Sequence, residues 1–242
     1  VWNSPGRQFF NPIEMSDQAP FVDAAKAVDP NNRDNTFISY YSYGQMLGLA
    51  LDLSLRELGL NLDDYMKLVW TKYGKNETPY FIKDLHETLN VYSRKEFGDQ
   101  FFNSYVYKSE MPNFKRLFES VGIALSQDDT KVYFGETVEK GIITTNPKIN
   151  SPAYSAGLEK GDSLMEVGRT KYYAWLNFDK IVNIAKPGSK MNVVYERFGV
   201  QKETKVTFQK DPSYSLSFFE ANGLELSVKQ ELARAAWLEG EE

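Results

Sequence analysis

The sequence contains no cysteine and a single histidine, His86, and these two shortages exclude several kinds of functional site. Without cysteine the chain has no disulfide and no thiolate, whether as a nucleophile or as a metal ligand. Catalytic zinc usually takes three protein ligands, commonly with two or more histidines or cysteines among them. The segment HETLN begins at His86 like the zinc motif H-E-x-x-H, but it ends in Asn90 and so lacks the second ligand. We expect neither a metal site nor a cofactor in this chain, and we interpret His86 as a surface or boundary residue of its helix.

A basic surplus and a long apolar run are also missing. The net charge is −5 at pH 7, so the chain has no positive field of the kind that attracts nucleic acid. The longest apolar stretch, residues 46–55, contains Asp52 and is shorter than the roughly 18 residues that predict a membrane span. The absence of cysteine is compatible with the cytosol and with the periplasm or cell envelope. The chain begins Val-Trp-Asn without a methionine, which indicates a processed protein or a piece of a longer one.

The first half of the chain has the apolar period of helices. Leu47, Leu51 and Leu55 form one stripe of a segment that is apolar almost all round, which is typical of a central helix. The predicted helix starts are Asn61, Thr78 followed by Pro79, and the capping-box pair Ser93 and Glu96. We expect helices over residues 40–58, 61–74, 78–89, 93–107 and 112–122, joined by short links into an all-α unit over residues 1–122.

The second half changes to short β-like runs that are separated by turns. These runs lie within residues 123–210, and one helical stretch over residues 175–188 interrupts them. Residues 211–242 follow as a tail, and its last part, residues 226–239, has the pattern of an amphipathic helix. In that helix we predict that Leu232, Ala236 and Trp237 dock on a neighbouring surface. The chain is therefore predicted to be multidomain, with an α unit followed by a β-rich unit.

The segment INSPAYSAGLEKGDSLMEVG, residues 149–168, carries a motif whose chemistry can be read from its residues. Pro152 favours the start of a short helix, and the small side chain of Ala153 lets that helix lie close to a sheet. Gly157 ends the helix, and the sequence KGD makes a tight turn into a strand. The order S-P-A-x-x-A-G-L-x-x-G-D resembles the signature of PDZ domains, especially the bacterial, protease-linked kind. The resemblance covers roughly residues 123–210 and implies a PDZ-like β-barrel or sandwich with two helices.

The PDZ resemblance also implies a peptide-binding groove, because these domains add an extended peptide as a strand to an exposed sheet edge. The residues that the resemblance assigns to this groove are Tyr133, Phe134 and Gly135 in a carboxylate-binding loop, and Phe178 and Ile181 on the opposite helix. Glu136 and Glu139 follow the loop, and their negative charge disfavours a bound carboxylate. Two interpretations therefore stay open, a groove that binds a peptide or a protein C-terminus, and a rigid spacer that packs on its neighbour.

The helical unit and the PDZ-like unit together resemble a second family. The matching positions are Ser4 to Arg7, Ser39 to Tyr41, Gly44, Asp52 with Leu53, Arg56, Leu62 to Asp64, Met66, Trp70, and Tyr73 with Gly74. This pattern resembles the C-terminal helical subdomain of glycyl aminopeptidase-type zinc metallopeptidases, which are thermolysin-like enzymes with a PDZ domain behind the catalytic domain. The order of the elements holds from about residue 3 to the end of the chain.

This second resemblance implies that the chain is the C-terminal part of a zinc-dependent aminopeptidase that hydrolyses the N-terminal residues of peptides. The family's H-E-x-x-H motif and its further glutamate ligand lie before the region that matches, so zinc is implied for the parent protein only. Residues 1–122 would then pack on the N-terminal catalytic region of the same protein. The chain by itself would be inactive, because it lacks the zinc ligands.

The resemblance assigns a catalytic role to one tyrosine. Tyr41 stands where related enzymes place a tyrosine that donates a hydrogen bond to the developing oxyanion, and a phenol suits this role because it is a neutral donor at pH 7. The alternative is that Tyr41 packs between helices. Tyr40, Tyr43 and Arg7 are further candidates for substrate binding, although Tyr43 replaces the lysine that is usual in the family. Arg7 would either bind a substrate carboxylate or donate hydrogen bonds to the local backbone.

Three functions therefore stay open from the sequence alone. The chain is part of a zinc aminopeptidase, or an adaptor that binds peptides through its PDZ-like unit, or a structural module that docks and orients a partner. An apolar patch left bare on the helix over residues 40–58 would favour the docking of another segment. We favour the first function for the parent protein.

Overall fold

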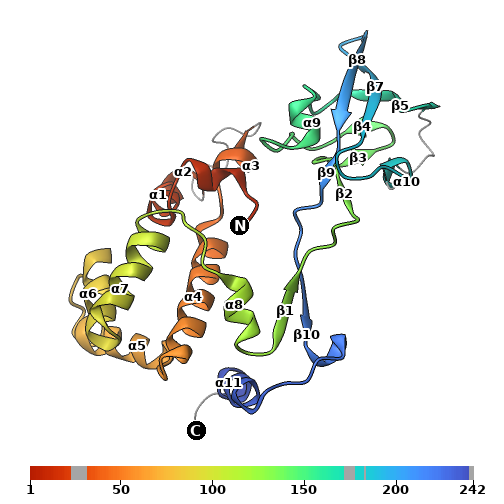
Figure 1. The fold of residues 1–242 in the computed structure, drawn as a ribbon. Coiled ribbons are helices and arrows are strands. Elements are labelled where there is room, and N and C mark those ends of the chain that lie inside the picture. Colours follow the sequence, from red (N-terminus) through yellow and green to blue (C-terminus); the bar gives the residue numbers. More distant parts are fainter. Residues whose placement is uncertain (23–31, 172–177, 183, 240–242) are drawn as a thin grey trace.

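The computed structural model describes residues 1–22, 32–171, 178–182 and 184–239, which form two lobes joined by a narrow ribbon (Figure 1). The helical lobe consists of residues up to 122 together with the C-terminal helix. The β lobe consists of residues 127–214, and the ribbon between the lobes is formed by two strands. Within the described residues, no helix combines the length and the apolarity that crossing a membrane would require.

The helical lobe follows the predicted succession of helices. In chain order its elements are the 3₁₀ turn η1 (Pro5–Gln8) and helices α1 (Pro12–Asp17), α2 (Ala19–Val22), α3 (Arg33–Thr36), α4 (Tyr40–Glu57), α5 (Leu62–Val69), α6 (Ile82–Tyr92), α7 (Lys95–Phe101) and α8 (Phe114–Glu119). Two π-helical turns, η2 (Trp70–Gly74) and η3 (Phe102–Val106), extend α5 and α7.

Helix α4 is the central element of the helical lobe, as its nearly continuous apolar pattern predicts. Leu53 and Leu55 are 1 % and 0 % exposed, and Leu47 and Leu51 are also buried. Complete burial of one such side chain contributes about 1.5–3 kcal/mol. The other helices therefore pack around α4, and its N-terminal turn is fixed in place by its own buried residues.

Of the three helix starts predicted from the sequence, the structure confirms one and contradicts two. The Asp64 backbone N–H donates to the Asn61 side chain at 2.7 Å, which confirms Asn61 as the N-cap of α5. The predicted start at Thr78 is wrong, because α6 begins only at Ile82, where the Asp84 carboxylate accepts from the backbone N–H of Phe81. The predicted capping box at Ser93 is also wrong. The Ser93 hydroxyl donates backward to the Leu89 carbonyl at 2.7 Å, so it closes α6 and does not open α7.

The β lobe is built from antiparallel sheets. Its strands are β2 (Val132–Tyr133), β3 (Val138–Glu139), β4 (Ile142–Ile143), β5 (Ser163–Val167), β6 (Thr170–Lys171), β7 (Lys190–Arg197), β8 (Val200–Thr207) and β9 (Gln209–Lys210), with helices α9 (Pro152–Ser155) and α10 (Phe178–Val182). One sheet has the order β3-β4-β5-β7-β8, with β6 paired to β5, and β2 pairs separately with β9. Among the described residues these sheets stay open, so the closed barrel that the sequence resemblance implies is absent there.

The S-P-A-x-x-A-G-L-x-x-G-D segment folds as its residues predict. The Ser151 hydroxyl accepts from the backbone N–H of Tyr154 and caps the start of α9. The helix ends before Gly157, which has a left-handed backbone with a φ of 72°. The turn that follows ends at Asp162, which is 0 % exposed. Its carboxylate accepts two hydrogen bonds from the Arg197 guanidinium, both at 2.7 Å. This pair connects the start of β5 with the end of β7.

The residues after 210 return to the helical lobe and do not form a free tail. Strand β10 (Ser215–Phe218) pairs with β1 (Ile123–Ser126) to make the ribbon, and the chain then ends in helix α11 (Val228–Glu239) (Figure 1). The Arg234 guanidinium donates to the backbone carbonyls of Val121 and Gly122, just beyond α8. Trp237 packs against the core of the helical lobe as predicted, whereas Leu232 is 67 % exposed, so its predicted docking is wrong.

The two lobes also touch away from the ribbon. Asn35 is 3 % exposed, and its side chain donates to the Pro147 carbonyl and accepts from the Ile149 backbone N–H. The Asn3 side chain donates to the Pro212 carbonyl at 2.6 Å. These contacts join α3 and the first residues of the chain to the base of the β lobe.

Candidate functional site

The tyrosines at the start of α4 point in two different directions. Tyr41 is 70 % exposed, and its ring lies 4.6 Å from that of Tyr40. Tyr43 is 1 % exposed and belongs to a small buried cluster with Met15, Ile38 and Leu47. The structure therefore places Tyr41 where another molecule or segment can reach it, and it places Tyr43 in the core. Their roles in substrate binding and catalysis stay predictions.

The helix surface beside Tyr41 is bare. Gly44 and Gly48 follow Tyr41 by three and seven positions, which is the spacing of one helix face. A Cβ atom added at either glycine would meet no atom within 4 Å. This face, defined here as the Tyr41 face of α4, is consequently free of side-chain cover in the described part of the chain. It can accept another polypeptide at close range, because the two glycines present only backbone there.

Arg7 is engaged by the protein itself. Its two terminal nitrogens donate to the carbonyls of Trp2 and Ser109 at 2.8 and 2.9 Å, and the Ser109 hydroxyl donates back to the Arg7 carbonyl. Arg7 also lies beside Tyr43. Burial raises the pKa of the Tyr43 hydroxyl, and the Arg7 guanidinium acts in the opposite direction. Arg7 therefore donates to backbone carbonyls, one of them more than 100 residues away in sequence, and its binding of a substrate carboxylate stays a prediction.

Two of the predicted groove residues fill the interior of the β lobe. Phe134 and Phe178 are each 6 % exposed, and their ring centroids lie 4.9 Å apart. Tyr133 is half-buried in β2, and burial raises the pKa of its hydroxyl. The side chain of Ile181 lies outside the described residues. Phe134 and Phe178 therefore belong to the buried core of the β lobe, and the peptide groove to which they were assigned stays a prediction.

The loop before β3 has a special backbone. Gly135 has a φ of 104°, and a Cβ atom there would lie 2.3 Å from the Cβ of Ser151, so only glycine fits this position. The Glu136 carboxylate accepts from the Thr145 hydroxyl at 2.8 Å and from the Lys148 backbone N–H at 3.0 Å. Strand β3, which follows, is the terminal strand of its sheet. The loop and this sheet edge therefore lie together, and their use as a peptide-binding site stays a prediction.

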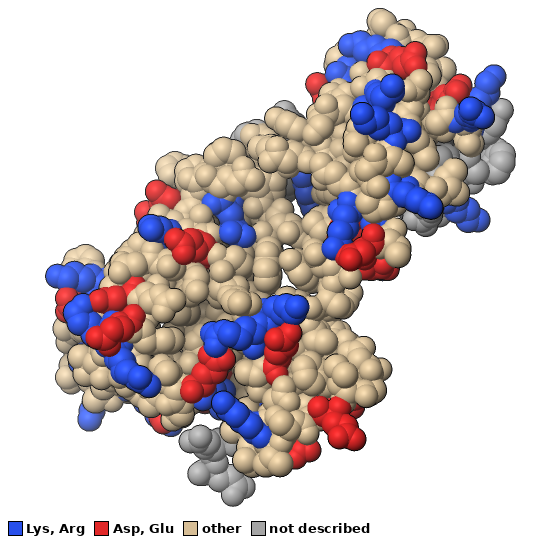
Figure 2. Space-filling model, viewed as in Figure 1, with Lys and Arg blue, Asp and Glu red and all other residues tan. Residues whose placement is uncertain are grey.

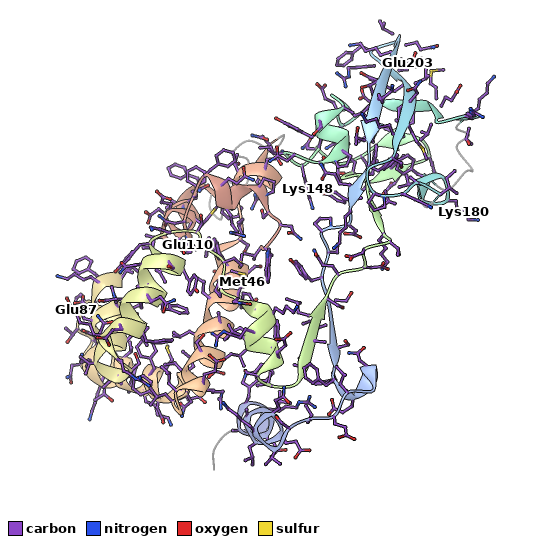
Figure 3. The ribbon with its side chains drawn as sticks, viewed as in Figure 1. Met46, Glu87, Glu110, Lys148, Lys180 and Glu203 are labelled. Carbon is purple, nitrogen blue, oxygen red and sulfur yellow. The ribbon has the colours of Figure 1, made fainter. Side chains whose placement is uncertain are left out.

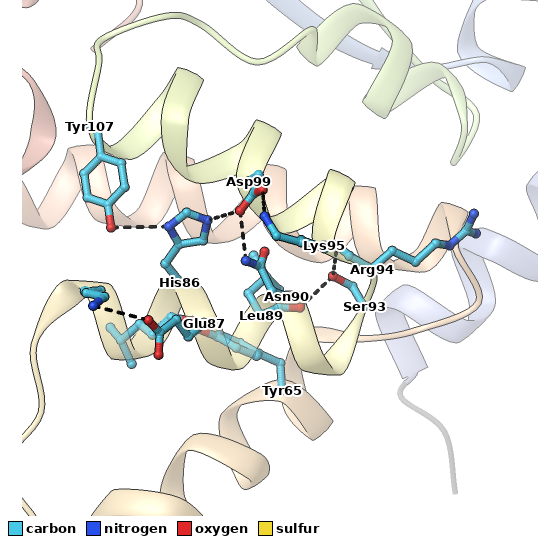
Figure 4. Close-up of polar contacts among 12 residues, drawn as sticks. Tyr65, His86, Glu87, Leu89, Asn90, Ser93, Arg94, Lys95, Asp99 and Tyr107 are labelled. Atoms are coloured by element: carbon cyan, nitrogen blue, oxygen red, sulfur yellow. Dashed lines mark hydrogen bonds and ion pairs between the residues drawn. The ribbon is translucent and has the colours of Figure 1, made fainter.

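A polar cluster around His86 is not visible in the sequence pattern (Figure 4). The His86 ring contacts the Asp99 carboxylate at 2.9 Å and the Tyr107 hydroxyl at 3.4 Å, and it stacks on Phe102. Lys95 also pairs with Asp99, and it is the largest cause of the lowering of the Asp99 pKa to about 2. Lys95 and Asp99 are four residues apart on α7, but His86 and Asn90 come from α6 and Tyr107 follows η3, so only the tertiary fold brings the whole cluster together.

The described residues offer no metal centre. Nowhere in residues 1–22, 32–171, 178–182 and 184–239 do three or more His, Cys, Asp or Glu side chains form a group that could hold a metal ion. The chain also has only one histidine and no cysteine in its whole length.

Comparison with known proteins identifies a shared fold. No protein-family model matches the sequence, and no curated protein matches it. The structure is similar to that of an aminopeptidase N family protein from Idiomarina loihiensis, with a TM-score of 0.76 and 22 % sequence identity. The likeness covers 97 % of this chain and 41 % of that chain, so the chain spans about two fifths of the length of this neighbour. At this identity the likeness establishes the fold.

Partial likenesses involve other proteases and a PDZ domain. A serine endoprotease from Yersinia pestis is 25 % identical over 34 % of this chain and 30 % of its own, with a TM-score of 0.29. The HtrA3 PDZ domain bound to a phage-derived ligand is 11 % identical over 43 % of this chain and 100 % of its own, with a TM-score of 0.25. Likenesses of this extent do not establish a shared fold.

Proposed function

We propose that this chain is the C-terminal part of a zinc-dependent aminopeptidase of the thermolysin-like clan, which removes N-terminal residues from peptides. The observation that carries the proposal is the fold shared with an aminopeptidase N family protein over 97 % of the chain. The sequence pattern around Ser39 to Tyr41 and Leu62 to Asp64 supports the same assignment independently. In this proposal the β lobe is the PDZ domain of the enzyme.

The residues of this chain do not fit a catalytic zinc ion. A single histidine and no cysteine are present, and the described carboxylates form no group that could hold a metal. Zinc would therefore be bound by a part of the parent protein that is not in this chain. The 242-residue chain is consequently expected to have no peptidase activity by itself.

Tyr41 is the residue through which this chain would contribute to the reaction. An exposed phenol can donate a hydrogen bond to the carbonyl oxygen of a substrate as negative charge develops on it. The bare Tyr41 face of α4 leaves room for the remaining catalytic part beside this hydroxyl. The Tyr40 ring lies 4.6 Å from the Tyr41 ring at an interplanar angle of 35° and restricts its orientation.

The complete reading frame and its product test this proposal. An H-E-x-x-H motif is expected upstream of Val1, roughly 60–110 residues before it, as the family resemblance implies. The complete protein should hydrolyse aminoacyl anilides in a zinc-dependent way. Tyr41→Phe should lower kcat by about 10²–10³-fold with little change in KM, since an oxyanion donor acts in the transition state. Tyr80→Phe, at another exposed tyrosine of the helical lobe, is the matched control.

Two results would contradict the proposal. One is a complete reading frame without the upstream motif. The other is zinc-dependent hydrolysis by the 242-residue chain alone, which would mean that ligands exist where the sequence offers none.

A second candidate function is peptide binding at the edge of the β lobe, and the position of β3 favours it. This strand is the last of its sheet and follows the Gly135 loop, so its outer edge can accept an added strand. The Glu136 carboxylate is held by Thr145 and Lys148 and lies in the same loop region. Its charge favours peptides that do not place their terminal carboxylate at this loop.

A peptide titration that is followed by amide chemical shifts tests this candidate function. Peptides of mixed sequence, with free and with amidated C-termini, would be titrated into the labelled chain. Saturable shifts at Val138 and Glu139 are expected, with the amidated peptides bound at least as tightly. The absence of saturable shifts along β3 would leave the rigid spacer as the better interpretation of this lobe.

A further inference from the structure

A cleft of about 420 Å³ lies between the first residues of the helical lobe and the base of the β lobe. Figure 2 shows that the surface is hollowed between the two lobes. Small ligands usually bind in clefts of about 300–1,000 Å³, and such clefts occur preferentially at domain interfaces. The cleft is separate from the Tyr41 face of α4 and from β3, because neither lines it.

The charge of the cleft differs from that of the whole chain. The protein has 33 acidic residues and a net charge of −5, but no acidic residue lines this cleft, whereas Arg7 and Lys148 both do. Lys148 is exposed at the junction of the lobes (Figure 3), and its ammonium group has no carboxylate partner among the described residues. An unpaired ammonium group in a wall without carboxylates attracts a negatively charged group.

Two acidic side chains lie near this cleft but outside its lining. Glu136 and Asp211 both act on the Tyr133 hydroxyl, so they are close to one wall of the cleft. The Glu136 carboxylate accepts from the Thr145 hydroxyl and from the backbone N–H of Lys148 itself, and the Asp211 carboxylate accepts from the Ser213 backbone N–H at 2.8 Å. These two carboxylates are therefore oriented by the protein and lie outside the lining.

The other walls combine aromatic rings with amide side chains. Trp2 and Tyr133 line the cleft, and the Trp2 ring is held by Tyr214 at 4.7 Å. Gln8 and Asn150 are exposed amides in the same lining, and each offers both a donor and an acceptor. Such groups match the alternating N–H and C=O of a peptide, while the rings accept an apolar side chain.

We propose that this cleft binds a short peptide through its terminal carboxylate, with Lys148 supplying the charge and Gln8 and Asn150 pairing with peptide groups. The site is pre-formed, because Asn3 and Asn35 fix the lobes on either side of it. A pre-formed site loses less conformational freedom on binding, which favours affinity. Such a site goes beyond peptide hydrolysis and does not depend on it.

Calorimetric titration of the 242-residue chain tests the proposal. The probe is acetyl-Ala-Phe-Ala with a free carboxylate, and its C-terminal amide is the matched ligand. The amide should bind about tenfold more weakly, the effect of losing one charge-assisted contact of about 1.4 kcal/mol. Lys148→Gln should weaken binding of the acid by the same factor and leave the amide unaffected. Lys171→Gln, at an exposed lysine elsewhere on the β lobe, is the control and should change neither.

Three outcomes of the calorimetric titration overturn the proposal. They are no measurable binding of the acid, equal affinity for acid and amide, and equal effects of Lys148→Gln and Lys171→Gln. Amide shifts confined to β3 would also contradict it, because the ligand would then occupy the sheet edge. Failure of the aminopeptidase assignment appears in the complete reading frame and in activity assays and not in this titration, so the two results are distinguishable.

Discussion

Asp162 and Arg197 form a doubly hydrogen-bonded ion pair in the β lobe. Asp162 is fully buried, and besides the guanidinium its carboxylate binds the backbone N–H of Glu159 at 2.8 Å. The Arg197 pKa is raised, chiefly by its hydrogen bonds to Asp162. Asp162→Ala would leave Arg197 without its main partner and would leave the Glu159 N–H unpaired. We expect a loss of about 3–5 kcal/mol of unfolding free energy, measured by urea denaturation.

A neighbouring carboxylate supplies the control for this prediction. Glu159 lies 3.3 Å from the same guanidinium, but its side chain is 64 % exposed. Glu159→Gln should therefore cost less than about 1 kcal/mol, as exposed ion pairs usually do. Equal losses for the two variants would show that Asp162 acts as one more surface charge and not as a buried anchor.

Single residues were predictable where local chemistry decides their role. Asn61 caps α5 because its side chain reaches an N–H three positions later, and the residues of the S-P-A-x-x-A-G motif act in the same short-range way. Ser93 has equally good local spacing, but the end of α6 competes for its hydroxyl. Phe134 was assigned to a groove by resemblance, while its burial depends on Phe178, which is distant in sequence.

At the scale of elements, the Asp99 cluster joins α6 to α7 and to η3, and its strength should depend on pH. The pKa of Asp99 falls from 3.8 to about 2, with Lys95 as the first cause and Asn90 as the second. A depressed pKa means that the folded state favours the ionised carboxylate. This stabilisation is fully present above the unfolded value of 3.8 and is lost as the pH falls through about 2.

Acid denaturation of two variants checks this linkage. As the pH is lowered from about 4 to about 2, the urea concentration at the unfolding midpoint should decrease for the natural chain. In Asp99→Asn this decrease should be smaller. Lys95→Met removes the largest cause of the lowered Asp99 pKa. The decrease in the urea midpoint should then occur closer to pH 3.8. An unchanged slope in Asp99→Asn would show that other carboxylates control acid unfolding of the helical lobe.

The existence of the long elements was predictable, but their ends and edges were not. The apolar pattern of α4 is so wide that only a central position can bury it, and the predicted and observed ranges nearly coincide. Helix α6 begins later than the Thr78-Pro79 pair predicts. The Thr78 backbone N–H donates to the Tyr73 carbonyl, and the Tyr80 ring packs on the Tyr73 ring. The segment before Ile82 therefore packs on η2, which extends α5, and does not begin α6.

At the scale of the whole molecule, the return of the chain to the helical lobe was the least predictable feature. Pairing of β1 with β10 joins residues about ninety positions apart, and no period in the sequence records it. The same holds for Arg234, whose carbonyl partners lie far upstream. Domain order could be predicted because each lobe has its own local pattern. The junction could not be predicted, because it depends on a few polar side chains that match only in three dimensions.

Asn35 is one of the polar side chains that connect the two lobes, and its removal should loosen their junction. It is buried and bonds both the Pro147 carbonyl and the Ile149 N–H, so Asn35→Ala leaves two partly buried backbone groups without this partner at the interface. Each such loss costs about 1–3 kcal/mol. Amide exchange at Ile149 should therefore accelerate by about 10–100-fold, while the core amides of both lobes keep their rates. Asn76→Ala, at an exposed loop of the helical lobe, should change nothing. If Ile149 exchanged at its original rate in Asn35→Ala, the ribbon and the Asn3–Pro212 contact would hold the two lobes together without Asn35.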